Sequence, residues 1–241
     1  MKKIMWALSC VSLIGTAIAL RFLPEKVPMH YDLAGNIDRW GSKYETLLFP
    51  VILLLLSLFW TLLTGYYEKK ASATADEKES AAAHSNVKVL GIGAVSTTAL
   101  LIVIQGVLLF GAFKAAASGA AVQAVKIGNI TAVLMGIMMI VLGNFMTKTR
   151  ANRAVGVRVS WSLYNDTTWR KSNRFGAFAL MIAGVLTILL AVLLQSDLGA
   201  LAATLGPVLL ALIATLIYAH RVYVQEIERE KGENNRNGCN Q

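Results

Sequence analysis

The sequence predicts an all-α integral membrane protein with six transmembrane helices and with both termini in the cytoplasm (N-in/C-in). Of its 241 residues, 56% are hydrophobic and only 15% are charged, whereas soluble domains carry about 25% charged residues. The apolar residues fall into six blocks of roughly 17 to 26 residues, which is the length a helix needs to cross a bilayer. A soluble core does not need six such blocks.

The N-terminal blocks predict two helices, at residues 1–20 and 45–67, joined by a polar outer loop. The first block follows Lys2 and Lys3 and resembles a cleavable signal peptide, but its apolar run exceeds the usual ~7–15 residues, so we expect a retained helix. Pro50 falls in the first turns of the second helix, where proline is tolerated. Residues 68–88 are polar and alanine-rich, which fits either a solvated helix or a flexible linker.

The remaining blocks predict four helices and a charged tail that we expect to be disordered. Small residues recur every four positions in two of these helices and predict close helix packing; they are Gly128, Ala132 and Gly136, then Ala203, Pro207, Ala211, Thr215 and Ala219. The amides Gln105, Asn129 and Asn144 are expected to form interhelical hydrogen bonds. The predicted organisation is a helical pair with its outer loop (1–67), a cytoplasmic linker (68–88), a four-helix region (89–220) with a basic cytoplasmic loop (146–175), and a cytoplasmic tail (221–241).

The orientation follows from the 23 lysines and arginines. With the N-terminus inside, 17 of them lie in inner segments and 6 in outer loops, as the positive-inside rule requires. The loop at residues 146–175 alone holds seven, against a single acid, Asp166. Because these charges lie between membrane segments, the net charge of +9 indicates contact with membrane lipid and not direct binding of nucleic acid.

The sequence predicts no enzyme, no cofactor and no metal site. It has no HExxH, GxSxG or P-loop motif. The outer loop contains His30 and Asp38 but lacks compact ligand spacing, and Cys10 and Cys239 are too far apart in sequence and setting to suggest a disulfide. The centres of the helices lack acidic and basic residues, which argues against an ion-coupled transporter.

Two loop motifs resemble those of the SdpI-type bacterial toxin-immunity membrane proteins. One is LPEKVPMHYDLAGNIDRWGSK at residues 23–43, and the other is GNFMTKTRANRAVGVRVSWSLYNDTTWRKSNRF at residues 143–175. The candidate residues in the outer motif are Pro24, Pro28, His30, Gly35, Asp38, Trp40, Gly41 and Lys43. Those in the cytoplasmic motif are Asn144, Lys148, Asn152, Gly156, Arg158, Trp161, Asn165, Trp169, Lys171 and Arg174.

The resemblance implies a multi-pass protein of the bacterial cytoplasmic membrane that gives resistance to, or senses, an extracellular peptide toxin. It also implies a cytosolic transcriptional repressor as a partner. The chain departs from the family pattern at Thr147, Ala151, Val159 and Asn173. Asn165 or Asp166 is expected to cap a helix, and the cations of the basic loop either anchor it on lipid or dock a partner. A small solute transporter or permeation protein is the alternative function.

Overall fold

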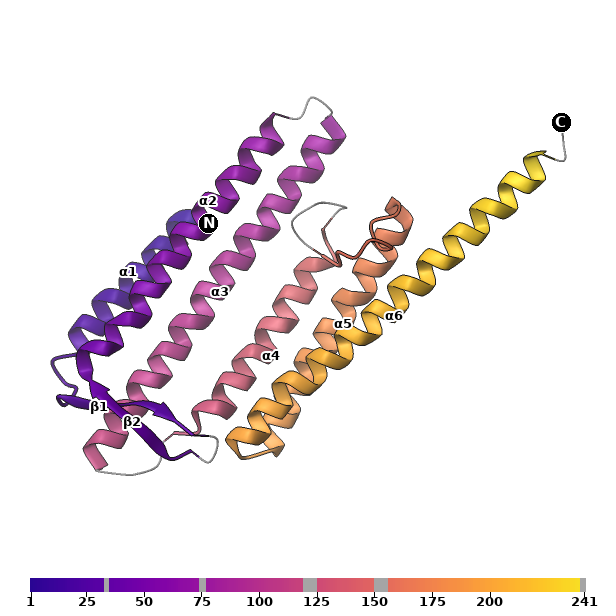
Figure 1. Cartoon of the computed structure of the whole chain (residues 1–241). Helices are drawn as coiled ribbons and strands as arrows, with labels where there is room; N and C mark the ends of the chain where they lie inside the picture. Colours follow the sequence, from indigo (N-terminus) through magenta and orange to yellow (C-terminus); the bar gives the residue numbers. More distant parts are fainter. Residues whose placement is uncertain (33–34, 74–76, 119–124, 150–155, 239–241) are drawn as a thin grey trace.

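A computed structural model describes residues 1–32, 35–73, 77–118, 125–149 and 156–238 (Figure 1). Within these residues, six helices are long and apolar enough to cross a membrane, which confirms the predicted fold class. They are α1 (Lys2–Ala19), α2 (Leu48–Ser72), α3 (Glu77–Ser118), α4 (Ile127–Met146), α5 (Asp166–Leu193) and α6 (Asp197–Gly238). Pro50 lies in the first turn of α2, where its missing N–H is not needed.

The helices form two groups of three, α1–α3 and α4–α6, with α3 beside α4 (Figure 1). The start of α1, the end of α2, the start of α3 and the end of α6 lie at one end of the molecule (Figure 1). Successive helices therefore run in opposite directions, as expected for a chain that crosses the membrane six times. Which end faces the cytoplasm stays a prediction from the lysine and arginine count.

Small residues bring α4 and α5 together as predicted. A Cβ atom on Gly136 would lie 2.7 Å from the carbonyl oxygen of Gly184, and one on Gly184 would lie 2.5 Å from that of Gly136. Ala132 packs in a buried cluster with residues of α5 and α6, including Ala203. The second series faces inward along α6, because Ala203 and Ala219 are fully buried. Helices α4, α5 and α6 therefore contact one another through bare backbone at glycines and through the methyl groups of alanines.

Polar side chains join the helices of the α1–α3 group. Gln105 of α3 bonds to Ser12 and Thr16 of α1, which confirms its expected interhelical role. Ser9 and Ser57 share a hydrogen bond of 2.8 Å between α1 and α2. In lipid, such bonds replace the water that a polar group would otherwise need.

Of the other two amides predicted to bond between helices, Asn129 does so, whereas Asn144 is exposed. Asn129 donates to the backbone oxygens of Ala191 and Leu194, at 2.6 and 2.8 Å, and so ties α4 to the end of α5. Asn144 is exposed near the end of α4.

Two segments, the outer loop and the C-terminal tail, have more regular structure than the sequence predicts. The outer loop contains an antiparallel hairpin, β1 (Lys26–Tyr31) and β2 (Ile37–Ser42), followed by a 3-10 turn (Lys43–Leu47). In the 68–88 segment, the described residues continue helices α2 and α3, which agrees with the helical one of the two alternatives.

The tail expected to be disordered continues α6 as far as Gly238. The helix persists because Val222 and Glu226 are buried, and because Arg229 pairs with Glu226 at 2.8 Å and with Glu233 at 3.7 Å. Pairs at this spacing stabilise an isolated helix by about 0.2–0.5 kcal/mol each. Pro207 lies within α6, which continues past it.

Candidate functional site

The outer hairpin is anchored to the helices through β1. Val27 of β1 is fully buried and packs with Leu23 and with Ala112 of α3. The strands pair from Lys26 opposite Ser42 to Tyr31 opposite Ile37, with an irregular register between them. Apolar burial of β1 thus fixes a two-stranded sheet that would be only marginally stable alone.

Charged side chains link the hairpin to its flanking segments. His30 Nδ1 lies 2.7 Å from Asp38 Oδ1, so two residues of the predicted outer set meet across the strands. Lys43 Nζ lies 2.8 Å from Glu25 Oε1, which closes the base of the hairpin. His30 and Asp38 are both exposed, whereas Lys43 is only 15% exposed beside the exposed Glu25. Their main effect is to hold the strands in one register.

Two glycines of the outer motif occupy positions that a side chain would disturb. Gly35 has φ of 83°, the left-handed region in which glycine is favoured. A Cβ on Gly41 would lie 2.4 Å from Glu45 Oε1, and this oxygen accepts the backbone N–H of Ser42 at 2.9 Å. Glycine is thus favoured by its backbone conformation at Gly35, and a side chain at Gly41 would displace the Glu45 carboxylate from Ser42.

A cavity of about 250 Å³ lies beneath the hairpin. Its walls come from β1, α2 and α3 and include Pro28, Met29, Phe49, Gln105, Leu108 and Leu109. Gln105 supplies an amide, and Tyr31, Glu45 and Thr46 add three more polar side chains to the mostly apolar walls. Trp40, His30 and Asp38 are exposed on the hairpin, as is Pro24 before it. The outer motif therefore builds an exposed polar and aromatic surface beside an apolar cavity.

In the cytoplasmic loop, Asn173 of α5 holds three backbone segments together. Its side chain is 2% exposed and donates to the backbone oxygen of Met146 at 2.9 Å and to Thr149 Oγ1 at 3.0 Å. Its Oδ1 accepts the N–H of Val157 at 3.3 Å. Gly156 has φ of 112°, and a Cβ there would lie 2.4 Å from that same oxygen. The close approach explains the glycine.

The start of α5 is capped as expected. Asn165 Oδ1 accepts the N–H of Thr168 at 2.8 Å, and Thr168 Oγ1 accepts the N–H of Asn165 at 3.0 Å. The buried Ser162 hydroxyl donates to the carbonyls of Val157 and Val159, at 2.9 Å each in bifurcated geometry. These bonds fold the loop into a fixed turn before the helix.

The loop also packs against the C-terminal half of α6. The rings of Trp161 and His220 meet edge to face at 5.7 Å, and those of Tyr164 and Tyr223 at 5.2 Å. Tyr164 Oη donates to Glu230 Oε2 at 2.6 Å. This bond raises the pKa of Tyr164 above its usual range, so the phenol stays a neutral donor at physiological pH.

The cations of the cytoplasmic motif point outward. Lys148, Arg158, Lys171 and Arg174 are all exposed. In contrast, Trp169 is 3% exposed, and Gly156, Trp161 and Asn165 are partly buried. Asn152 lies outside the described residues. The structure therefore divides the predicted set into a packed framework and an exposed basic surface.

Sequence reasoning missed several residues that shape this region. They are Ser162, Thr168, Asn173 and Glu226, all buried and all hydrogen-bonded. Small polar residues in a basic loop look like solvated positions, so no local pattern marks them as buried. Asn173 adjoins the motif position Arg174 and was noted only as a departure from the family pattern. Among the described residues, no group of three or more His, Cys, Asp or Glu side chains could hold a metal ion.

Comparison with known proteins matches both regions. The SdpI/YfhL protein family matches residues 148–219, which cover the cytoplasmic loop, α5 and much of α6. A domain of unknown function (DUF1648) matches residues 7–54, which cover most of α1, the hairpin and the start of α2. Immunity protein SdpI of Bacillus subtilis (strain 168) is 24% identical over 214 residues, 89% of this chain and 91% of that protein. No solved structure gives a significant match. The chain therefore resembles the SdpI-type proteins in both loop regions, and it is a multi-pass protein of the bacterial cytoplasmic membrane.

Proposed function

We propose that the chain is a membrane immunity protein that protects its cell against an extracellular peptide toxin, acting by binding and not by catalysis. Its similarity to immunity protein SdpI along most of both chains supports the role. The observation that carries the proposal is the outer hairpin with the cavity of about 250 Å³ beneath it. This segment combines the exposed indole of Trp40 with a mostly apolar cavity.

The hairpin offers a peptide two kinds of contact. Trp40, 44% exposed, presents an aromatic surface beside the pair formed by His30 and Asp38. The cavity presents apolar walls at Phe49 and Leu108. Aromatic anchors next to apolar pockets contribute most of the binding energy in many interfaces. An apolar segment of the toxin would enter the cavity while its polar part lies on the hairpin.

The basic surface on the other side is the proposed site for a cytosolic partner. Arg158 is exposed on the loop before α5, and Lys171 and Arg174 are exposed on the first turns of α5. Hydrogen bonds of Asn173 and Asn165 fix the backbone that joins them. A rigid, cationic surface suits an acidic face of a transcriptional repressor. When no repressor is bound, the same surface contacts anionic lipid. The repressor is thus part of the proposal for this loop.

The test is toxin sensitivity in the host. Deleting the gene should sensitise cells to toxin-containing supernatant from the host's own cultures, and the intact gene should restore resistance. Leu108→Trp should lower resistance about tenfold or more, because the indole would occupy the cavity. Val103→Trp, on an exposed face of the same helix, is the matched control. Trp40→Ala should also weaken resistance. Phe22→Ala is the control at another exposed aromatic residue, since Phe22 is 70% exposed and Trp40 is 44% exposed.

Two results would reject the immunity function. One is unchanged toxin sensitivity in the deletion strain. The other is solute flux into liposomes by the purified chain that Leu108→Trp abolishes while resistance persists, which would support the transporter alternative.

A further inference from the structure

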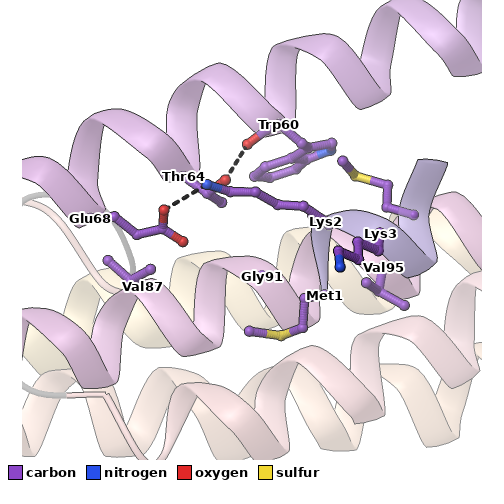
Figure 2. Close-up of a pocket in the computed structure, with 11 residues that line it drawn as sticks. Met1, Lys2, Lys3, Trp60, Thr64, Glu68, Val87, Gly91 and Val95 are labelled. Atoms are coloured by element: carbon purple, nitrogen blue, oxygen red, sulfur yellow. Dashed lines mark hydrogen bonds and ion pairs between the residues drawn. The ribbon is translucent and has the colours of Figure 1, made fainter.

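A second cavity, of about 280 Å³, lies at the opposite end of the α1–α3 group (Figure 2). The start of α1 forms one wall with Lys2 and Lys3, and the end of α2 forms another with Trp60 and Glu68. The start of the apolar part of α3 closes it with Gly91 and its neighbours. This is the lysine-rich end of the bundle, where the positive-inside rule places the cytoplasmic leaflet.

The charges at the rim favour an anion. Lys2 Nζ lies 2.6 Å from Glu68 Oε2, and the two side chains are 36% and 49% exposed, so they pair at the solvent edge of the cavity. Lys3 is exposed and has no carboxylate partner in the part of the chain that the structure describes. The side chains of Lys2, Lys3 and Glu68 together carry a net charge of one positive unit. The N-terminal N–H groups of α1 add a partial positive charge at the same place.

The interior of the cavity is apolar and adaptable. Val87, Ala94 and Val95 line the α3 wall. A Cβ on Gly91 would lie 2.7 Å from Met1 Cε, so the thioether of Met1 rests on bare helix backbone. Methionine is flexible and changes rotamer readily. The cavity can therefore widen without a shift of the helices.

One polar group in the wall lacks an internal partner. The indole N–H of Trp60 is buried and has no hydrogen-bond acceptor in the described structure. A buried donor without an acceptor costs about 1–3 kcal/mol. Tryptophan at this depth of a membrane commonly meets the headgroup and ester region of the lipid. An acceptor oxygen from a lipid would satisfy the group.

We propose that this cavity binds an anionic phospholipid of the cytoplasmic leaflet. The phosphate lies against Lys3 and Lys2 at the rim, and an acyl chain lies along the apolar α3 wall past Gly91. A soluble phosphate compound would satisfy the cations but would leave the apolar walls without a partner. The phospholipid satisfies both, and it bridges the start of α1 to α3.

The experiment is native mass spectrometry of the full-length chain, released from nanodiscs that contain phosphatidylglycerol and phosphatidylethanolamine in equal amounts. The wild type should retain phosphatidylglycerol selectively. The double variant Lys2→Gln/Lys3→Gln should lose at least about tenfold in retention, because each lysine near an anionic surface contributes about fivefold in affinity. The Gly91→Leu variant should show a similar loss, since its side chain takes the place of the acyl chain.

The double variant Lys69→Gln/Lys88→Gln is the matched control, because it removes two exposed lysines from the same end without touching the cavity. It should retain phosphatidylglycerol as the wild type does. Equal loss in this control would overturn the proposal in favour of a diffuse charge effect, and full retention by Gly91→Leu would overturn the acyl-chain position. Should Gly91→Leu not fold, Val95→Trp replaces it and is read in the same way. Competition by inorganic phosphate would assign the site to a soluble anion.

Discussion

At the scale of single residues, Asn173 has the largest effect on the cytoplasmic loop. One buried amide bonds to Met146 and Thr149 at the end of α4 and to Val157 after the undescribed segment 150–155. Both ends of the basic loop therefore depend on a residue that is itself uncharged. The cations around it predict the orientation of the loop in the membrane, while the hydrogen bonds of the amide hold its shape.

Replacing Asn173 with Ala should destabilise the protein by about 2–3 kcal/mol, because it leaves buried backbone groups without partners. For a chain of this size that corresponds to a fall of roughly 5–10 °C in the apparent melting temperature. The measurement is thermal unfolding of the detergent-solubilised protein. Arg170→Ala, one turn earlier and exposed, is the control and should change the melting temperature little. Equal effects in both variants would show that the amide does not organise the loop.

At the scale of elements, α4 and α5 differ from α1 and α2 in how they pack. The α4–α5 contact depends on glycines whose backbones touch, at Gly136 with Gly184 and at Gly143 with Ala177. The α1–α2 contact uses hydrogen bonds between side chains, such as Trp6 Nε1 to Thr61 Oγ1 at 2.9 Å. Lipid provides no hydrophobic force between helices, so close packing and hydrogen bonds must hold them together. The α4–α5 pair uses the first and the α1–α2 pair uses the second.

The Gly184→Ala variant should lose about 1–3 kcal/mol of stability, because its Cβ would overlap the carbonyl oxygen of Gly136 and push the helices apart. Gly106→Ala is the matched control in α3, where nothing lies within 4 Å of an added Cβ. There the change should be neutral or stabilising by up to about 1 kcal/mol, from the better helix propensity of alanine. Chemical denaturation in mixed micelles compares the two. A Gly184→Ala protein as stable as Gly106→Ala would contradict the close approach.

At the scale of the whole molecule, the hairpin and the basic loop lie at opposite ends of the bundle (Figure 1). Each belongs mainly to a different three-helix group, and the two matched families divide the chain in the same way, at residues 7–54 and 148–219. The protein thus has one motif for each side of the membrane.

The predicted orientation can be tested with single cysteines in a background that lacks Cys10 and Cys239. A membrane-impermeant maleimide should label Asn36→Cys, exposed on the hairpin, in intact cells. Ser160→Cys, exposed in the basic loop, should react only after lysis. Labelling of Ser160→Cys from outside would invert the topology and would move the proposed lipid site to the outer leaflet.

Much of the fold could be predicted from composition and spacing, because membrane length and the positive-inside rule act on the chain segment by segment. The blocks around Pro50 and Gly136 became helices α2 and α4 where expected, and Gln105 formed its interhelical bonds. The loop motifs by themselves pointed to the SdpI-type family, which the comparisons support.

The sequence by itself thus determined the membrane class, the span positions, the predicted orientation and the resemblance to SdpI-type proteins. Only the tertiary structure decided how the loops are built, because their order depends on contacts between distant residues. Burial of Val27 against Ala112 turns a polar loop into a hairpin, and Asn173 brings Gly156 against α5. Glu226 and Tyr164 keep α6 helical beyond the membrane. No local pattern encodes such contacts, since each partner lies tens of residues away in the chain.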